Sequence, residues 1–324
     1  MCFIPFLYKD FLMAVVAFCF IGELVVMIDE NVLDKFSVLV SSQQLHKPKI
    51  QMKENFDWSK FIRYFACTEG ETFMITKIYG HRGCMGTYPE NTLAGFMQAI
   101  REGVDGIELD VHMTKDGEIV VIHDEFLDRT TDGTGYIKDL TFAEIRKYSA
   151  GVKFSHYDAF VDQWRLEKVP TLKEVLELLK PYEVELNIEL KTTRFMYKGI
   201  EEAVHQIVQS YGNNRKVIYS SFHLPTLMRM NKLDPNADIA LLVEGMLPHP
   251  HEYLDYFHLE SVHISKSAIL NNVAHWKPVF PRLRAWTVND ANDMKQLFDL
   301  RVAAIMTDFP EKALIYRNER EAFI

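Results

Sequence analysis

This sequence has few cysteines and no net positive charge. Only four cysteines occur among 324 residues, and none form a Cys-x-x-Cys pair, so neither a disulfide framework nor a thiolate metal site is supported. Acidic residues outnumber basic ones by 45 to 36, giving a formal net charge of −9. A broad nucleic-acid-binding surface needs the opposite balance. A small anionic substrate stays open, because a few local positive charges are enough to bind it.

The overall composition is that of an ordinary globular protein, with 48% hydrophobic and 25% charged residues. The length suits one large α/β domain or two smaller ones. From Met74 to Ile324, short apolar runs alternate with helical patterns, which is typical of parallel βα units. This stretch of about 250 residues has the usual size of a (β/α)₈ barrel. We therefore predict an N-terminal extension over residues 1–73 and a barrel domain over residues 74–324.

The extension contains an apolar run, Phe11–Ile28, that is interrupted only by Glu23. We expect this run to form a helix, followed by a polar linker, and two alternatives stay open for its role. Its length reaches the lower end of what spans a bilayer, although Glu23 would cost about 3 kcal/mol near the bilayer centre. It is either a membrane anchor or a helix docked on the main domain. A signal peptide fits poorly, because Lys9 is the only leading positive charge and no clear cleavage site follows. We expect a cytoplasmic location, with membrane association if the run is an anchor.

Eight segments predict the parallel strands of a closed barrel. They are KIYGH, DGIELDVHM, EVELNIELK, KVIYSSF, DIALLVE, SVHIS, RLRAWTV and AAIMTD. A helix is predicted after the first strand, and Gly103 is its expected end. An Asp-Gly turn at Asp116 and Gly117 makes the following VVIHD an antiparallel hairpin arm and not the next parallel strand.

A long gap between residues of about 125 and 169 separates this hairpin from the next barrel elements. It contains a capping box at Thr141 and Glu144, and a second capping box at Thr171 and Glu174 starts the helix that follows. Gaps of this kind are often lids or specificity loops. We therefore predict an α/β fold, a TIM (β/α)₈ barrel with a small insertion after the second-strand hairpin and an apolar helical extension at the N-terminus.

Charged side chains recur at alternate positions in two of the predicted strands. Glu108 and Asp110 share one face of IELDV, and Glu189 and Lys191 share one face of NIELK, because side chains two apart on a strand point the same way. Bare carboxylates inside a barrel would be costly, whereas Mg²⁺ and Ca²⁺ prefer such oxygen ligands. The three acids therefore predict a divalent-cation site. The alternative is a buried ion-pair network of these acids with Arg82 and Lys191.

Two histidines end apolar runs beside these strands. His81 ends the first strand, directly before Arg82, and His123 ends the hairpin arm. This setting fits a general acid and a general base. The other ten of the twelve histidines, among them His249 and His251, lack it, and we expect them on the surface or in loops.

Six motifs occur in an order that resembles one enzyme family. They are HRG with PENT, GIELDVHMTKDGEIVVIHD, RTTDGTG, IELK, AWTVN and TDFP, and they cover Ile78–Pro310. Together they resemble the glycerophosphodiester phosphodiesterases. The resemblance implies a TIM barrel with a small insertion, a divalent cation, and hydrolysis of glycerophosphodiesters to glycerol phosphate and an alcohol. Residues 1–73 match nothing in the catalytic domain of that family.

The resemblance also implies roles for the matched polar positions. They are an acid/base pair, His81 and His123; metal ligands, Glu108, Asp110 and Glu189; and substrate-binding residues, Arg82, Lys191 and Trp286. Arg82 and Lys191 look like the phosphate-binding cations. Trp286 is similar to an aromatic residue near the substrate, and ordinary core packing is its alternative. We favour His81 as the base and His123 as the acid in the first step.

Several functional alternatives stay open at this point. One is a lysophospholipase D-like hydrolase on the same fold, for which the N-terminal apolar run would suit a lipid substrate. Another is a non-catalytic phosphodiester-binding module. The presence of every matched polar residue argues against this alternative. The preferred alcohol head group, the choice between Mg²⁺ and Ca²⁺, and the oligomeric state are not readable here. The nucleophile is either water or a hydroxyl of the substrate's own glycerol.

Overall fold

The computed structural model describes residues 5–8, 11–14 and 75–321, and the chain divides into two compact units, Met1–Phe56 and Asp57–Ile324. In the first unit, β1 (Pro5–Tyr8) and β2 (Phe11–Ala14) pair as antiparallel strands, with Tyr8 opposite Phe11. The predicted helix is therefore wrong for its first four residues. Two short neighbouring apolar segments satisfy their backbone hydrogen bonds by pairing with each other here. Residues 15–28, the remainder of that prediction, lie outside the described residues.

One finding bears on the predicted membrane anchor. Within the described parts of the chain, no helix is both long enough and apolar enough to cross a membrane. The choice between an anchor and a docked segment for the N-terminal run stays a prediction.

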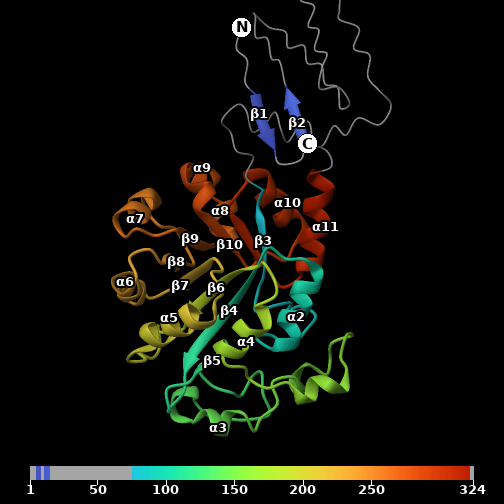
Figure 1. Ribbon diagram of the computed structural model, residues 1–324, viewed down its shortest axis with the longest axis vertical. Coiled ribbons are helices and arrows are strands. Elements are labelled where there is room, and N and C mark those ends of the chain that lie inside the picture. The colour runs from blue at the N-terminus through green and yellow to red at the C-terminus, as the bar shows by residue number, and fades with distance from the viewer. Residues whose placement is uncertain (1–4, 9–10, 15–74, 322–324) are drawn as a thin grey trace, which may run out of the picture. The chain divides into compact units, whose positions relative to one another are not determined.

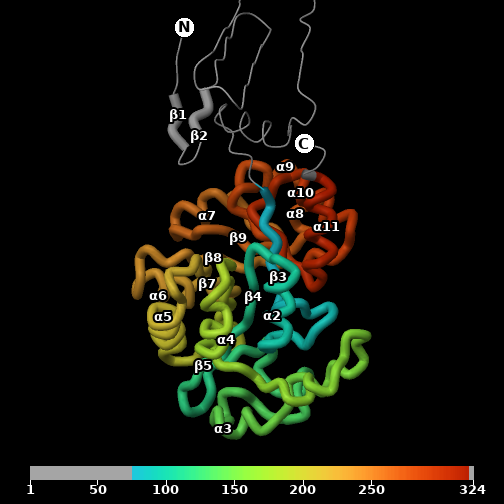
Figure 2. Tube along the Cα trace, turned by 45° about the vertical axis from the view of Figure 1, so that its right-hand side comes forward, coloured from blue at the N-terminus to red at the C-terminus, as the bar shows by residue number. Residues whose placement is uncertain are grey.

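Eight parallel strands close into a barrel in the second unit (Figures 1 and 2), which confirms the predicted TIM-barrel fold. Around the barrel they run β3 (Lys77–Gly80), β11 (Ala304–Thr307), β10 (Leu283–Trp286), β9 (Ser261–Ser265), β8 (Asp238–Val243), β7 (Val217–Ser221), β6 (Glu185–Leu190) and β4 (Gly106–Met113). Pairing of β3 with both β11 and β4 closes the ring. All eight predicted parallel strands are present.

Helices follow the strands and cover the outside of the barrel (Figure 1). They are α2 (Leu93–Glu102), α4 (Leu172–Leu179), α5 (Ile200–Tyr211), α6 (Leu224–Leu233), α7 (Pro250–Tyr256), α8 (Lys266–Leu270), α9 (Val273–Trp276), α10 (Ala291–Leu300) and α11 (Pro310–Glu321). Two helix ends predicted from the sequence are confirmed. Gly103 ends α2 in the left-handed conformation, and Thr171 and Glu174 form a capping box at the start of α4.

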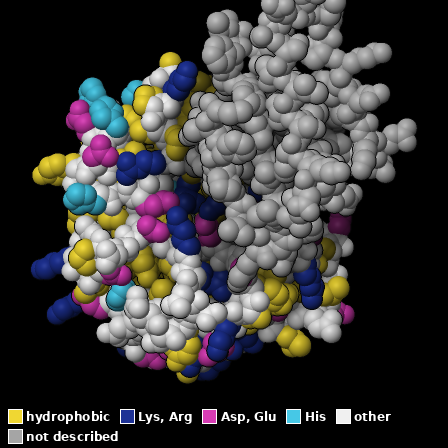
Figure 3. All heavy atoms as spheres, turned by 45° about the horizontal axis from the view of Figure 1, so that its top comes forward, with side chains coloured by type: hydrophobic (Ala, Val, Ile, Leu, Met, Phe, Trp, Pro, Cys, Tyr) yellow, Lys and Arg dark blue, Asp and Glu magenta, His cyan; other side chains and the backbone are white. Residues whose placement is uncertain are grey.

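Alternation along the strands separates an outer core from the barrel interior. Ile78 and Ile107 belong to a large apolar core that includes residues of the surrounding helices. The alternate position Tyr79 belongs to a separate small cluster with Ala304 and Met306. The alternate positions of β4 and β6 are mostly polar, and they carry the predicted metal ligands Glu108, Asp110 and Glu189. On the face drawn in Figure 3, basic and acidic side chains of the described residues are interspersed.

The predicted hairpin and insertion follow β4. The short strand β5 (Ile119–Val121) pairs antiparallel with β4 after a turn in which Gly117 has a φ of +88°. Between β5 and α4 lie four short helical turns, drawn in green in Figure 1 at the end toward which β4 points. They are η1 (Ile137–Asp139), α3 (Phe142–Ile145), η2 (Val152–Phe154) and η3 (Asp162–Leu166). The insertion has its own small apolar core, and its predicted capping box at Thr141 is present. The domain boundary at Met74 and the insertion limits near residues 125 and 169 stay predictions.

Candidate active site

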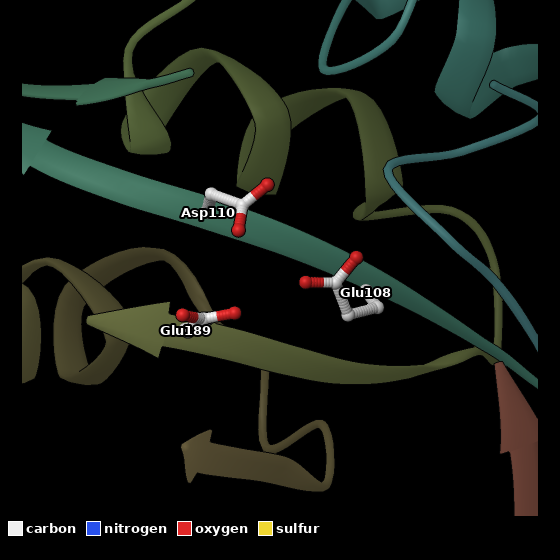
Figure 4. A group of neighbouring side chains, drawn as sticks. All are labelled: Glu108, Asp110 and Glu189. Atoms are coloured by element: carbon white, nitrogen blue, oxygen red, sulfur yellow. The ribbon is translucent and has the colours of Figure 1, made fainter. Parts of the chain in front are cut away.

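Three carboxylates meet inside the barrel toward the carboxyl ends of β4 and β6 (Figure 4). The two strands are direct neighbours, and their register places Asp110 opposite Glu189, with Glu108 two residues before Asp110. Each of the three acids offers an oxygen, and these oxygens all lie within 4.8 Å of one another. All three side chains are buried. The structure therefore brings together the residues predicted to bind a cation.

Both predicted phosphate-binding cations lie among these acids. The Lys191 ammonium nitrogen is 3.0 Å from Asp110 Oδ1 and 2.7 Å from Glu189 Oε1. The Arg82 backbone N–H donates to Glu108 Oε2 at 2.9 Å, and its Nε lies 3.3 Å from Asp110 Oδ2. The ion-pair network that we considered as an alternative is thus present in the same place as the acidic cluster.

The two cations do not compensate all three acids equally. Burial, reinforced by Asp110, holds the pKa of Glu108 well above its usual value, and burial also raises the pKa of Glu189. For Asp110, burial acts in the same direction, but Lys191 and Arg82 outweigh it and hold the pKa of Asp110 well below its usual value. For Glu108 and Glu189 the nearby positive charge therefore does not offset burial. Three converging oxygen donors with this deficit fit a divalent cation.

His81 follows β3 and is oriented by a carboxylate from the far end of the chain. Its Nδ1 lies 2.6 Å from Asp308 Oδ1, and Asp308 also accepts a hydrogen bond of 2.6 Å from Asn289 Nδ2. Burial would raise the pKa of Asp308, but His81 and Asn289 outweigh it and lower that pKa. An ionised Asp308 accepts the Nδ1 proton. The other ring nitrogen, Nε2, lies 4.0 Å from Glu108 Oε2 and is directed toward the acidic cluster.

His123 follows β5 and is held at two points. Its Nδ1 lies 2.7 Å from Asp124 Oδ1. Its backbone carbonyl accepts a hydrogen bond of 3.0 Å from His112 Nε2, and Tyr197 OH lies 2.9 Å from His112 Nδ1. Because burial lowers the pKa of His112 to about 4, His112 is neutral and donates through one nitrogen while accepting through the other. The imidazole and the backbone of His123 are therefore both anchored.

Among the remaining histidines that the structure describes, the predicted surface or loop location is wrong for two. His112 in β4 and His263 in β9 are fully buried. These two were expected on the surface or in loops because they lack the setting of His81 and His123, but the interior of this barrel accepts polar side chains that find partners there. His263 Nε2 lies 3.1 Å from Ser261 Oγ. His249 and His251 are exposed, as predicted.

Trp286 stands at the end of β10. Its ring meets Phe222 edge to face at a centroid distance of 5.7 Å, and it packs beside the interior cluster of Tyr79, Ala304 and Met306. The packing alternative is therefore present, and Trp286 Nε1 is buried without a hydrogen-bond partner. A substrate-binding role for Trp286 stays a prediction.

Five residues of this region were not assigned a role from the sequence. Each of them lies in one of the quoted motifs: Glu90 in PENT, Asp124 in VVIHD, Arg129 in RTTDGTG, Asn289 in AWTVN and Asp308 in TDFP. Membership of these motifs is the sequence signal that points to the five residues, but the contacts among the residues form only when the barrel closes. Asp308, for example, is 227 positions away from His81 in the sequence.

Comparisons with known proteins identify the family of this chain. The model of the glycerophosphoryl diester phosphodiesterase family matches residues 81–312. A glycerophosphodiester phosphodiesterase of Bacillus altitudinis is 38% identical over 249 residues, which cover 76% of this chain and 99% of that protein. One from Caldanaerobacter subterraneus subsp. tengcongensis is 39% identical over 239 residues, covering 74% and 96%. The solved structure of an Oleispira antarctica phosphodiesterase, in complex with the product sn-glycerol-3-phosphate, superposes with a TM-score of 0.69 at 28% identity, covering 75% and 97%. The chain belongs to the glycerophosphoryl diester phosphodiesterase family.

Proposed function

We propose that this chain, a phosphoric diester hydrolase by family, hydrolyses small glycerophosphodiesters to glycerol phosphate and an alcohol. His81 and His123 supply acid/base catalysis, and Glu108, Asp110 and Glu189 hold one divalent cation, Mg²⁺ or Ca²⁺. One observation carries the proposal: three buried acids with incomplete charge compensation lie beside two imidazoles, each fixed by a carboxylate. The product named for the Oleispira antarctica relative supports glycerol phosphate as a product here.

A phosphodiester resists hydrolysis because its anionic oxygens repel nucleophiles and its alkoxide is a poor leaving group. Arg82 and Lys191 carry fixed positive charges that stabilise the phosphoryl oxygens as charge develops on them. A bound divalent cation supplies Lewis-acid polarisation of the phosphoryl group. Trp286, the last residue of β10, supplies an aromatic contact that limits how the substrate can lie.

The two histidines handle the protons. With its Nδ1–H donated to Asp308, His81 uses the lone pair of Nε2 to accept a proton from the attacking hydroxyl. His123, whose Nδ1 is bonded to Asp124, donates a proton from Nε2 to the leaving alcohol. The attacking hydroxyl belongs either to water or to the substrate's own glycerol, in which case a cyclic phosphate forms first.

The proposed function is tested by a metal-dependent assay on a panel of glycerophosphodiesters, with glycerol phosphate detected as the product. We expect turnover with Mg²⁺ or Ca²⁺, and a loss of about 10²-fold or more in His81→Ala and in His123→Ala. His249→Ala, which changes an exposed histidine, is the matched control and should keep wild-type turnover. Binding of the panel without turnover would instead indicate the non-catalytic phosphodiester-binding module.

A second candidate, hydrolysis of lysophospholipids, is favoured by exposed apolar side chains in the loops after three strands. Met196 follows β6, Phe222 follows β7 and Met246 follows β8, with 78%, 36% and 48% exposure. These loops lie at the carboxyl end of the barrel, where the substrate enters. An acyl chain leaving the site would find apolar contacts there. Comparing glycerophosphocholine with a lysophosphatidylcholine, in wild type and in Met196→Ser, decides between the two substrates.

A further inference from the structure

Arg129, in the insertion, donates hydrogen bonds to two different carboxylates at once. Its Nη1 and Nη2 bind Glu90 Oε2 and Oε1 at 2.6 and 2.8 Å. Its Nε and Nη2 bind Asp124 Oδ2 and Oδ1 at 2.8 and 3.0 Å. The guanidinium thus makes a bidentate pair on each side, the arrangement that gives arginine–carboxylate contacts their directional strength.

Each of these carboxylates also holds a residue of the proposed active site. Glu90 Oε1 accepts from Arg82 Nη1 at 2.9 Å. Asp124 Oδ1 accepts from His123 Nδ1 at 2.7 Å. Hydrogen bonds therefore run without a break from Arg82 through Glu90, Arg129 and Asp124 to His123.

The charges along this chain depend on Arg129. Glu90 is almost fully buried, and burial would raise its pKa, yet its bonds to Arg129 and Arg82 lower that pKa. Burial would likewise raise the pKa of Asp124, but hydrogen bonds from His123 and Arg129 outweigh it and hold that pKa below its usual value. Its hydrogen bond to Glu90 is the main reason that the pKa of Arg129 is raised. All three groups stay charged, so the pairs keep their geometry.

We propose that Arg129 is a positioning residue that fixes the imidazole of His123 relative to the guanidinium of Arg82, acting through Asp124 and Glu90. This inference rests on the roles given to His123 and Arg82 in the proposed function. Arg82 and His123 come from different loops, after β3 and after β5, and His123 is partly exposed. A misplacement of about 1 Å between a phosphate-binding group and a proton donor can cost about 10²-fold in rate.

Lysine cannot replace Arg129 in this arrangement, because a single ammonium nitrogen cannot make two bidentate pairs in fixed directions. We expect Arg129→Lys to lower kcat by about 10- to 100-fold while the melting temperature stays near that of the wild type. Millimolar guanidinium should restore part of the activity lost in Arg129→Ala. Arg165→Lys is the matched control, because Arg165 lies in the same insertion but pairs with exposed Asp162; it should keep wild-type kcat.

Wild type and His123→Ala are measured in the same assay, so that a failure of the proposed function can be distinguished from a failure of the role proposed for Arg129. A wild type without turnover contradicts the proposed function. A normal wild type and an impaired His123→Ala, together with wild-type kcat in Arg129→Lys, overturn the role of Arg129 alone. A kcat that falls only in step with the melting temperature, without rescue by guanidinium, assigns Arg129 a structural role and also overturns it. Non-additive losses in Arg129→Lys combined with Asp124→Asn support the proposal.

Discussion

Each of the two proposed catalytic imidazoles has its Nδ1 against a carboxylate, but the two carboxylates reach it by different routes. Asp124 directly follows His123 in the sequence and is fixed by the insertion through Arg129. Asp308 follows β11, which pairs with β3, and meets His81 only because the barrel closes. One imidazole is therefore oriented locally and the other by the closure of the sheet.

This difference predicts the effect of Asp308→Asn. An asparagine amide keeps the shape of the carboxylate but not its charge, and its single oxygen cannot accept from both His81 and Asn289, as the two carboxylate oxygens of Asp308 do. In either orientation of the amide, His81 loses the charged partner that keeps its proton on Nδ1. We expect kcat to fall by about 10- to 100-fold with an unchanged far-ultraviolet circular dichroism spectrum.

The control for this change is Asp299→Asn, because Asp299 is an exposed residue of α10 that pairs with Arg320 of α11. Its kcat should equal that of the wild type. If Asp308→Asn also keeps wild-type kcat, the contact between His81 and Asp308 does not orient the catalytic ring.

The cation site gives a second prediction at this scale. Glu108 and Glu189 have raised pKa values because burial outweighs the nearby positive charge, so added positive charge should be strongly favoured there. We expect excess chelator to abolish turnover and Mg²⁺ or Ca²⁺ to restore it. Elemental analysis and isothermal titration calorimetry measure the binding.

Glu189→Gln should weaken this metal binding, whereas Glu177→Gln, on the exposed face of α4, should not. Full turnover in excess chelator, with no metal found by elemental analysis, contradicts the cation site.

The residues predicted for the site lie where their strands place them, because alternation along β4 and β6 determines which side chains share a face. What could not be predicted is which groups meet across the barrel. The bond from Asp308 to His81 and the two bidentate pairs of Arg129 depend on strand order, register and the path of the insertion. Periodicity in one segment carries none of this information.

Among the secondary-structure elements, β9 carries a buried histidine whose protonation affects stability. His263 is fully buried, beside Arg284, and burial with this neighbour lowers the pKa of His263 to about 3 from an ordinary value of 6.5. In the unfolded chain the imidazole takes up a proton as pH falls through 6.5, whereas in the folded chain it stays neutral until about pH 3. The folded state therefore loses stability as pH falls between these values, and the loss is absent above pH 6.5.

This sign leads to a measurable prediction for His263→Gln. Two pH units below the unfolded pKa, the penalty from His263 is about 2.7 kcal/mol. The free energy of unfolding of His263→Gln should fall less steeply than that of the wild type from about pH 6.5 to about pH 4.5. Urea titrations at several pH values measure this slope. His249→Gln, at an exposed position, is the control and should follow the wild type; an equal slope in all three proteins contradicts a neutral buried His263.

Elements were predictable where a local pattern decides them. The strands, the Asp-Gly hairpin and the caps at Gly103, Thr141 and Thr171 follow from short-range signals that the structure repeats. The prediction failed at Phe11–Ala14, where an apolar run favoured a helix but the residues pair with β1. Length and hydrophobicity alone do not distinguish a helix from a strand in such a run.

At the scale of the whole molecule, the second unit contains every element needed to close the barrel. Described residues from Ile75 to Glu321 include all eight parallel strands and the six motifs. The first strand is tied to both of its neighbours, and Arg317 of α11 forms an ion pair with Asp105 just before β4. Contacts within the described part of this unit thus join its last helix to the segment before β4.

We therefore predict that a chain beginning at Met74 folds and hydrolyses a soluble glycerophosphodiester. A chain beginning at Asp57, where the second compact unit begins, is the matched control. If the Asp57 chain is active and the Met74 chain is not, residues 57–73 belong to the catalytic domain and the predicted boundary is wrong. If both are inactive while the full chain is active, the first unit is required as well.

The same three chains test the role of the apolar run Phe11–Ile28. An anchor predicts that the full chain sediments with membranes and that both shortened chains stay in the supernatant. A docked segment predicts no difference in sedimentation but a lower melting temperature after its removal, because each Å² of apolar surface returned to water costs about 25 cal/mol. For a segment that buries several hundred Å² this is on the order of 10 kcal/mol before the entropy of ordering the segment is subtracted. Even a small net remainder is visible in a melting curve, so equal melting and equal sedimentation of all three chains would exclude both roles.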